Sequence, residues 1–313
     1  MWTGLIGHSA CLEHLPPRGH PESADRLRAV TAALDTEAFA SLVRIEAPRA
    51  DDAALLRAHA RQHVDAVKTV FAAEASARGY CQLDPDTVMS AGSLEAALRA
   101  SGAVIAAVDE IHAGRIRNAF CAVRPPGHHA ERARAMGFCL FNNVAVGALH
   151  ARAVHGYRRI AIVDFDVHHG NGTQDIFWSD TEAFYASSHQ SPFYPGTGDS
   201  SECGLFGNVL NVPLHAGSGS RQFRAAYERQ ILPALQHFAP DFIFLSAGFD
   251  AHRDDPLAEL DLVENDFSWV THAVCEIARV CCGARVVSVL EGGYDLEALA
   301  RSAAAHVRAL MEA

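Results

Sequence analysis

Short apolar runs alternate along the chain with longer stretches in which apolar residues recur at helical spacing. The short runs, at 3–7, 119–123, 160–163, 183–187, 209–212, 241–246 and 285–290, are typical of strands in a parallel sheet, which is buried on both faces. The helical stretches cover 21–34, 51–77, 91–113, 142–155, 221–238, 265–281 and 296–312. This alternation predicts a doubly wound α/β fold with helices on both faces of a mostly parallel sheet. Residues 79–89, which contain Asp84-Pro-Asp86, are expected to form a loop.

Length and composition are consistent with that prediction and limit the class of protein. The 313 residues, 49% of them hydrophobic, can bury a large core, and with no linker in sight we expect one domain over 1–313. The net charge is −11 and no basic patch stands out, so we expect no nucleic-acid partner. No apolar run is long enough to span a membrane, and the first residues do not resemble a signal peptide. The eight cysteines have no CxxC spacing, which favours reduced thiols in a cytoplasmic protein.

Candidate chemistry is concentrated directly after the run at 160–163. Asp164, Asp166 and His168 alternate with other residues, so in an extended chain Asp166 and His168 point to the same side. In open α/β sheets, ligands bind at the carboxyl ends of the strands. We therefore expect Asp166 and His168 to converge on one small ligand, of which a divalent metal ion is the obvious candidate.

Three other predicted strands also end in polar residues that suit a metal site. His128 and His129 follow 119–123, Asp250 follows 241–246, and Tyr294 follows 285–290. Two carboxylates and one imidazole, with positions left for water and substrate, are typical of catalytic zinc, which lowers the pKa of bound water and polarises a carbonyl. We assign Asp166, His168 and Asp250 as the ligands.

Two histidines at one turn can take different roles if their partners differ. Asp164 would favour the charged form of one of them, and Asn171 would hold the other without adding charge. Tyr294 follows two glycines that let the backbone approach a ligand, and its phenol can donate to a developing oxyanion.

The aromatic residues Phe138 and Tyr194 each lie among loop-forming residues. Together the two rings would wall a narrow slot, although for either ring alone ordinary packing is the simpler interpretation.

At this point the motifs resemble a known family. They are Arg124-Pro-Pro-Gly-His-His129, Gly137-Phe-Cys139, Asp164-Phe-Asp-Val-His-His-Gly-Asn-Gly-Thr-Gln174, Pro195-Gly-Thr-Gly198, Ser246-Ala-Gly-Phe-Asp250 and Glu291-Gly-Gly-Tyr294. In this order, and over about 20–295, the chain resembles the zinc-dependent histone deacetylases, especially the class II-like branch with its bacterial amidohydrolases. The resemblance implies the arginase/deacetylase fold, with an eight-stranded parallel sheet between helices. It also implies hydrolysis of an N-acetyl amide to an amine and acetate.

The resemblance assigns roles to individual residues. It implies Zn²⁺ on Asp166, His168 and Asp250, with His129 as general base and acid, His128 as its electrostatic partner, and Tyr294 as the group that polarises the carbonyl. The implied substrate channel comprises Gly137, Phe138, Tyr194, Leu257 and Gly293, and Arg26 matches an arginine near the acetate exit. A K⁺ ion is implied at the Asp164 side chain, the Ser187 hydroxyl and the carbonyls of Asp166, His168 and Ser188.

Several positions depart from parts of that family. Position 171 is Asn, as in the class II branch, where class I enzymes carry Asp. Tyr194 stands where many relatives have Phe, and Leu257 lies where polyamine-specific relatives often have Glu. Residues 71–83 are too few for the loop insertion of the dimeric acetylpolyamine enzymes, so oligomeric state stays open.

Two alternatives to this prediction also stay open, as does the choice of substrate. An arginase-like enzyme with two metal ions would need an aspartate two residues after Asp250, where this chain has His252. A non-enzymatic protein could use the same slot to bind acetylated amines. Within the enzyme interpretation, the substrate is protein acetyl-lysine, an acetylpolyamine or another small amide.

Overall fold

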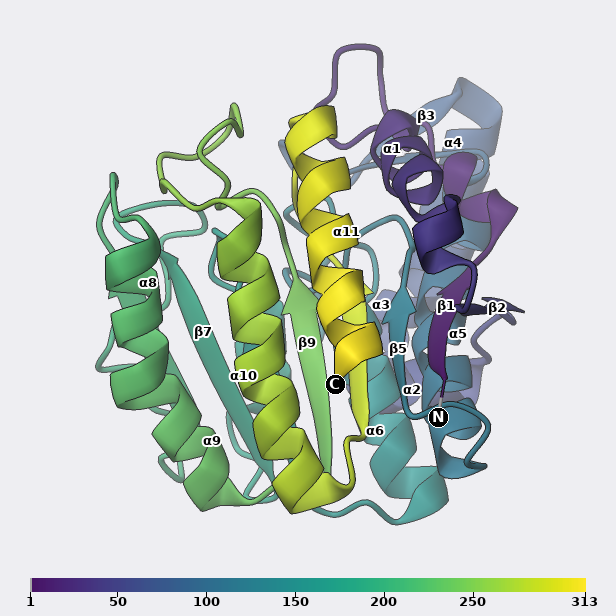
Figure 1. The fold of residues 1–313 in the computed structure, drawn as a ribbon. Helices are drawn as coiled ribbons and strands as arrows, with labels where there is room; N and C mark the ends of the chain where they lie inside the picture. The colour runs from purple at the N-terminus through teal and green to yellow at the C-terminus, as the bar shows by residue number, and fades with distance from the viewer. Residues whose placement is uncertain (1) are drawn as a thin grey trace.

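The computed structural model describes residues 2–313 and has a parallel eight-stranded sheet at its centre (Figure 1). The strand order is β2-β1-β5-β10-β9-β6-β7-β8, and every neighbouring pair is parallel. The strands are β1 (Thr3–Gly7), β2 (Val43–Glu46), β5 (Asn118–Cys121), β6 (Ile160–Asp164), β7 (Ala183–Gln190), β8 (Val209–Leu214), β9 (Phe242–Ala247) and β10 (Val286–Leu290). This arrangement confirms the predicted α/β fold class.

Helices cover both faces of the sheet, so the molecule has three layers. One face carries α1 (Ala24–Leu34), α8 (Ser220–Ala226), α9 (Leu232–Phe238), α10 (Glu264–Cys282) and α11 (Leu296–Glu312), in front in Figure 1. Behind the sheet lie α2 (Asp52–Ala58), α3 (Arg61–Asp65), α5 (Ser93–His112) and α6 (Asn143–His155). The short helices α4 (Ala72–Arg78) and α7 (Asn171–Phe177) complete the set. Two π-helical turns, at Ala66–Phe71 and Tyr227–Ile231, join α3 to α4 and α8 to α9.

Burial explains why the strands were readable from the sequence. All residues of β5, β6, β7, β9 and β10 are buried, as expected for strands covered by helices on both sides. Strand β2 was not predicted, because its residues alternate between half-buried and exposed at the edge of the sheet. Its sequence, Val-Arg-Ile-Glu, is too short and too polar to stand out as a buried strand.

Two predictions between residues 51 and 89 were wrong. The helix predicted over 51–77 is interrupted after Ala58, because His59 and Ala60 adopt extended backbone angles before the chain turns into α3. The predicted loop over 79–89 is an antiparallel hairpin of β3 (Tyr80–Gln82) and β4 (Val88–Ser90). The Asp84 carboxylate closes its turn by accepting hydrogen bonds from the backbone N–H groups of Asp86 and Thr87.

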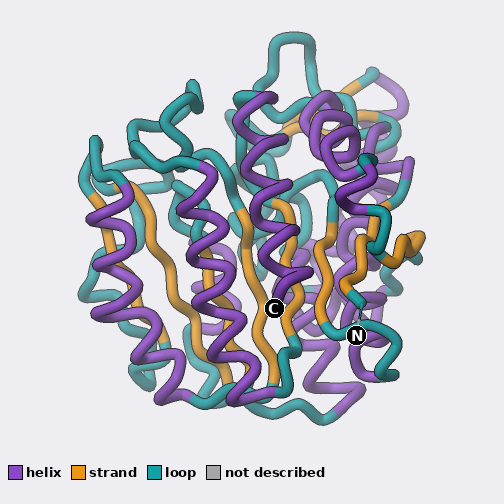
Figure 2. The backbone as a smooth tube through the Cα atoms, viewed as in Figure 1, coloured by secondary structure: helices purple, strands orange, loops and turns teal. Residues whose placement is uncertain are grey.

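The long connections of the chain gather above the carboxyl ends of the strands, at the top of Figure 2. This edge carries the polar segments that follow β5, β6, β9 and β10, and these four strands are neighbours at the centre of the sheet. Among residues 2–313, none of the helices is both long and apolar enough to cross a lipid bilayer.

Candidate active site

The residues predicted to bind a metal ion meet at the carboxyl edge of the sheet. Asp166 and His168 follow β6, and Asp250 follows the adjacent strand β9. The His168 Nδ1 atom lies 3.1 Å from Asp166 Oδ1 and 3.2 Å from Asp250 Oδ2. One possible ligand atom from each residue lies within 4.8 Å of the other two. We call these three residues the strand-edge cluster.

Backbone groups of neighbouring loops hold both carboxylates of this cluster. Gly292 donates its N–H to Asp166 Oδ2 at 2.8 Å, and Val167 donates to Asp250 Oδ1 at 3.0 Å. A Cβ atom at Gly292 would lie only 2.0 Å from Asp250 Oδ2, so the carboxylates occupy space that any side chain at position 292 would fill. The loop after β10 therefore shapes and orients the cluster without contributing a ligand.

The charges of the cluster suit a divalent cation. Asp166 and Asp250 are completely buried. Burial, and then the negative charge of Asp166, raise the pKa of Asp250, which means that its charge is poorly compensated. Burial would lower the pKa of His168, but its contacts with both carboxylates prevail and raise it to about 10. Two carboxylates and one imidazole are donors that fit Zn²⁺.

The two adjacent histidines have different partners, as the sequence predicts. His128 Nδ1 lies 3.0 Å from Asp164 Oδ2, and His129 Nδ1 lies 2.8 Å from Asn171 Oδ1. For His128, burial is outweighed by the charges of Asp166 and Asp164, and its pKa rises to about 10. For His129, burial and then the positive charge of His128 hold the pKa well below its usual value. One imidazole of the pair is therefore charged and the other neutral, as a general base requires.

Tyr294 is held beside the cluster by contacts on both sides. Its backbone N–H donates to Asp255 Oδ2 at 2.7 Å, and the Arg26 guanidinium lies 4.8 Å from the centre of its ring. Burial raises the pKa of its phenol well above 10, so the hydroxyl keeps its proton and can donate a hydrogen bond. The buried Arg26 donates to the carbonyls of Gly293 and Glu291, both at 2.5 Å.

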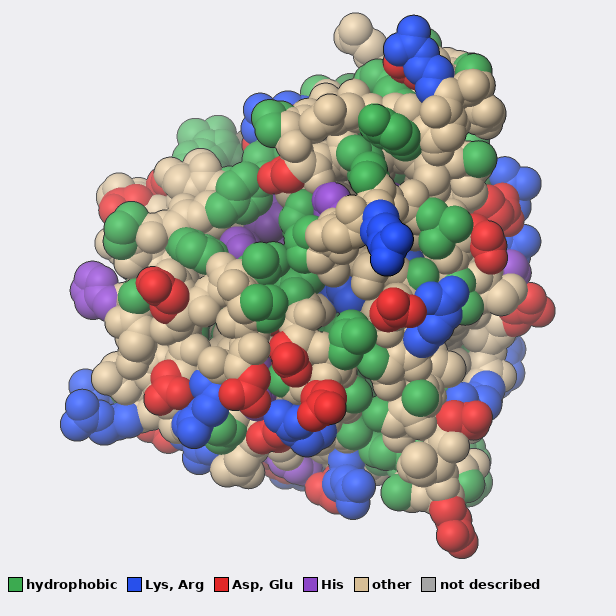
Figure 3. Space-filling view, turned by 90° about the horizontal axis from the view of Figure 1, so that it is seen from above, with side chains coloured by type: hydrophobic (Ala, Val, Ile, Leu, Met, Phe, Trp, Pro, Cys, Tyr) green, Lys and Arg blue, Asp and Glu red, His purple; other side chains and the backbone are tan. Residues whose placement is uncertain are grey.

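A narrow cavity of about 90 Å³ leads to this site. It is lined by Asp86, His129, Gly137, Phe138, His168, Tyr194, Leu257 and Tyr294, so four of the five predicted channel residues come together. The fifth, Gly293, is not among the lining residues, and a Cβ atom at this position would meet Leu299 and Phe249. Phe138 has a φ of +67°, a strained conformation for a non-glycine residue that is often found at ligand sites. Seen from above, histidine side chains lie recessed among hydrophobic ones on this face (Figure 3).

The residues predicted to bind potassium are also neighbours. Asp164 at the end of β6 pairs in register with Ser187 of β7, and Ser188 follows. The Ser187 hydroxyl lies 2.9 Å from His189 Nδ1. The Asp164 Oδ2 atom accepts a hydrogen bond from the Tyr185 hydroxyl at 3.2 Å, besides its contact with His128. The potassium ion itself stays a prediction.

Acidic residues at the site were missed in the sequence, among them Asp86 and Glu291. Asp86, in the turn between β3 and β4, lines the cavity, and its signal was the Asp-Pro-Asp turn that we took for an ordinary loop. Glu291 is buried after β10, and its Oε2 accepts hydrogen bonds from the backbone N–H groups of Gly127 and His128 at 2.6 and 3.1 Å. Glu291 therefore fixes the turn that carries the two histidines. It belongs to the motif Glu291-Gly-Gly-Tyr294, in which Glu291 had been given no role.

Two further histidines near the site have partners of their own. His169 lies 2.8 Å from the Thr197 hydroxyl and 3.1 Å from Gln174 Oε1, so both of its ring nitrogens have partners outside the strand-edge cluster. His252 is buried beside Asp254 and Glu264, with nitrogen–oxygen distances of 3.6 Å. It is not part of the strand-edge cluster, so the described residues offer no second ligand group there for a dimetal enzyme.

Comparison with known proteins agrees with the geometry. Residues 20–310 match the histone deacetylase domain. The chain belongs to the histone deacetylase family. A crystal structure of the HDA15 HD domain superposes with a TM-score of 0.92, at 38% identity, over 99% of this chain and 88% of that one. The family's fold, an α/β fold with an eight-stranded parallel sheet, is therefore the fold of this chain.

Relatives in this family differ in length. Type-2 histone deacetylase 2 of Dictyostelium discoideum is 39% identical over 99% of this chain, but the match spans only 21% of that protein. A histone deacetylase-like amidohydrolase of Pseudomonas aeruginosa is 40% identical over 88% of this chain and 73% of its own length. The chain thus spans only a small part of the larger relative. Membership of the histone deacetylase family supports a hydrolase activity.

Proposed function

We propose that this chain is a zinc-dependent amidohydrolase that removes acetyl groups from lysine or a similar primary amine and releases acetate. The observation that carries the proposal is the convergence of Asp166, His168 and Asp250 beside one charged and one neutral histidine. The family supports a deacetylase or amidohydrolase reaction, and the printed name of the Pseudomonas aeruginosa relative is that of an amidohydrolase.

The donor set of the strand-edge cluster suits zinc, with Asp166, His168 and Asp250 as its ligands. When bound, the ion would polarise the substrate carbonyl and lower the pKa of a water molecule. The neutral His129 is placed on the cavity wall, where it can accept a proton from the attacking water. We propose that His129 then passes this proton to the leaving amine nitrogen as the carbon–nitrogen bond of the amide breaks. The amide and the water molecule thus yield an amine and acetate.

Other side chains would stabilise charge during this reaction. The Tyr294 hydroxyl keeps its proton and lines the same cavity, so it can donate to the oxygen that becomes negative as the carbonyl carbon turns tetrahedral. Asp164 orients the ring of His128, which stays charged. The positive charge of His128, together with burial, keeps the neighbouring His129 neutral. We also propose that K⁺ binds behind this pair, at the Asp164 and Ser187 side chains and the carbonyls of Asp166, His168 and Ser188.

The cavity supports a slender substrate. Its volume of about 90 Å³ and its walls of Phe138, Tyr194 and Leu257 suit an unbranched aliphatic chain with an acetyl group at the inner end. Asp86 also lines the cavity and can accept a hydrogen bond from a substrate N–H group. Acetyl-lysine in a peptide and a short acetylated amine both meet these requirements.

The test is hydrolysis by the zinc-loaded protein. Acetate release from acetyl-lysine peptides, acetylputrescine, acetylspermidine and peptides with longer acyl groups would be compared as kcat/KM. We expect turnover on acetylated amines and much less on long acyl chains, because the cavity is small. Absence of turnover on every acetylated amine, with one zinc bound per strand-edge cluster, would contradict the proposal and favour a binding protein. Urea release with two manganese ions per chain would favour the arginase-like alternative.

A further inference from the structure

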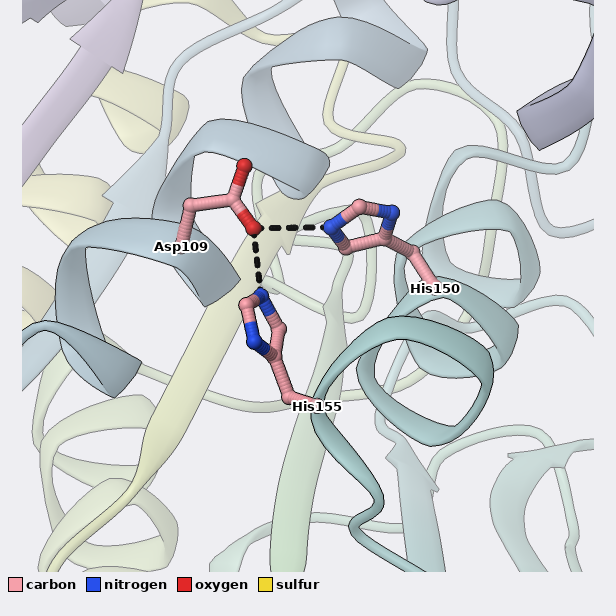
Figure 4. A group of neighbouring side chains, drawn as sticks. All are labelled: Asp109, His150 and His155. Atoms are coloured by element: carbon pink, nitrogen blue, oxygen red, sulfur yellow. Dashed lines mark hydrogen bonds and ion pairs between the residues drawn. The ribbon is translucent and has the colours of Figure 1, made fainter.

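A second group of metal-binding side chains lies away from the candidate active site. Asp109 on α5 and His150 and His155 on α6 form what we call the helix cluster (Figure 4). The Nε2 atoms of His150 and His155 lie 2.7 and 2.6 Å from the same oxygen, Asp109 Oδ1. Among residues 2–313, only the strand-edge cluster and the helix cluster bring three such side chains within 4.8 Å of one another.

We propose that the helix cluster binds a second Zn²⁺ ion, which joins α5 to α6. Two imidazoles and one carboxylate are ligands that zinc accepts, with water completing four-coordination. The three side chains are 44% (Asp109), 10% (His150) and 15% (His155) exposed, so an ion can enter from solvent and keep a water ligand. The helix cluster lies near the ends of α5 and α6, just before β5 and β6 begin. This is the opposite edge of the sheet from the strand-edge cluster, so the role of the site is structural.

Neighbouring aromatic side chains orient part of this cluster. The ring of His112 stacks on that of His155, with 4.0 Å between centroids, and His112 Nδ1 lies 3.1 Å from the Tyr157 hydroxyl. Such outer contacts fix the orientation of histidines at metal sites.

One neighbour opposes a cation. Arg57 Nη1 lies 3.4 Å from His150 Nδ1, an arrangement in which Nδ1 accepts and Nε2 carries the proton. Zinc needs the lone pair of Nε2, so on binding His150 would lose that proton to solvent and take one up at Nδ1, with no net change. The half-exposed Arg57 side chain would then turn toward solvent. Replacing Arg57 with Gln is therefore expected to tighten zinc binding at this cluster.

Zinc counting on intact protein tests the proposal. The protein would be loaded with zinc, dialysed against zinc-free buffer and analysed for metal per chain. We expect two zinc ions in the wild-type chain and one in Asp109→Asn or His155→Gln. The control His272→Gln removes an exposed histidine paired with Glu312 and should keep both. The variant Asp166→Ala should also keep one ion, so loss of the catalytic site and loss of the second site are distinguished.

Two further measurements do not depend on the folding of a variant at the helix cluster. Wild-type crystals soaked in zinc should show anomalous scattering between Asp109 and His155 as well as at the strand-edge cluster. Zinc should raise the Tm of Asp166→Ala, in which only the helix cluster can bind it, since a ligand of the folded state stabilises it. An Asp166→Ala protein that holds no zinc after dialysis, or no anomalous peak at the helix cluster of the wild-type crystals, would overturn the proposal.

Discussion

The two clusters contain the same residue types in opposite proportions. The strand-edge cluster has two fully buried carboxylates and one imidazole, and comes from the ends of neighbouring strands. The helix cluster has one carboxylate and two imidazoles, is half-exposed at Asp109, and comes from two packed helices. The negative charge of the strand-edge cluster must be compensated within a low-dielectric interior, whereas water reaches the carboxylate of the helix cluster.

This difference decides how strongly each site requires a metal ion. At the strand edge, three buried aspartates, Asp164, Asp166 and Asp250, face two histidines that are held charged, His128 and His168. Burial raises the pKa of Asp164, Asp250 and Glu291 in this interior, and buried carboxylate charge is costly without a cation. In the helix cluster, the Asp109 side chain is 44% exposed to water, so metal binding there adds stability that the fold does not depend on.

The largest expected effect follows from breaking the strand-edge cluster. Asp166→Ala should lose the zinc at that site and all measurable turnover, because it removes a ligand and the acceptor of the Gly292 N–H. Asp109→Ala is the matched control and should keep full turnover. Metal analysis and acetate release would be measured on both. Stoichiometric zinc at the strand edge of Asp166→Ala, located by anomalous scattering, would show that the ligand assignment is wrong.

Removing a hydrogen-bond donor while keeping the metal should have the next largest effect. Tyr294→Phe is expected to retain zinc and lose ~10²–10³-fold in kcat, the usual effect of one oxyanion donor. Tyr157→Phe removes a hydroxyl beside the helix cluster and should leave kcat unchanged. Full activity in Tyr294→Phe would mean that the tyrosine only packs in the cavity wall.

A smaller change should appear in the pH dependence. Asn171→Asp places a negative charge 2.8 Å from His129 Nδ1, which favours the protonated imidazole and raises its pKa. Because the base must be neutral, the acid limb of kcat/KM against pH should move to higher pH. Profiles of the wild type and Asn171→Asp would be compared, with Asn171→Gln as the uncharged control. An unmoved acid limb would argue against His129 as the base.

The smallest expected effect concerns stability without metal. Asp109→Asn should change the Tm in a chelator by only a few degrees, because partly exposed ion pairs contribute roughly 0–1 kcal/mol. Glu22→Gln should cost far more, since Glu22 is buried between Arg26 and Arg124, and breaking a buried pair costs about 3–5 kcal/mol. Equal losses of Tm in the two variants would contradict the proposed contrast between water-accessible and buried charges.

How far the sequence predicted the fold depended on local burial. Strand β6 was predicted to within one residue, because Ile160–Val163 is an unbroken apolar run. Strand β2 lay outside any such run and was therefore missed. The break in the predicted helix after Ala58 is imposed by tertiary contacts. There the His59 ring lies 3.0 Å from the Glu131 carbonyl and accepts a hydrogen bond from the Asn142 N–H.

The candidate site divides in the same way. Asp166 and His168 were recognisable because alternation in an extended segment places them on one side, and Asp250 because it follows a buried strand. Asp86 could not be recognised in this way. The hairpin that carries it to the cavity is held there by a hydrogen bond from the Phe138 backbone N–H to the Thr87 hydroxyl, and these two residues are far apart in the sequence. The helix cluster left no signal, because Asp109 and His155 are 46 residues apart on two helices.

The sequence by itself determined which residues end the strands, and parallel pairing then obliged those residues to share one edge of the sheet. Buried strands can be recognised from local apolar runs, so the metal ligands and the two histidines that follow these strands could be predicted from the sequence pattern alone. Only the tertiary structure decided how the charges are compensated. The pKa shifts of His128 and His129, the support from Glu291 and the closeness of α5 and α6 all arise from distances between segments far apart in the chain, and electrostatic energy depends on those distances.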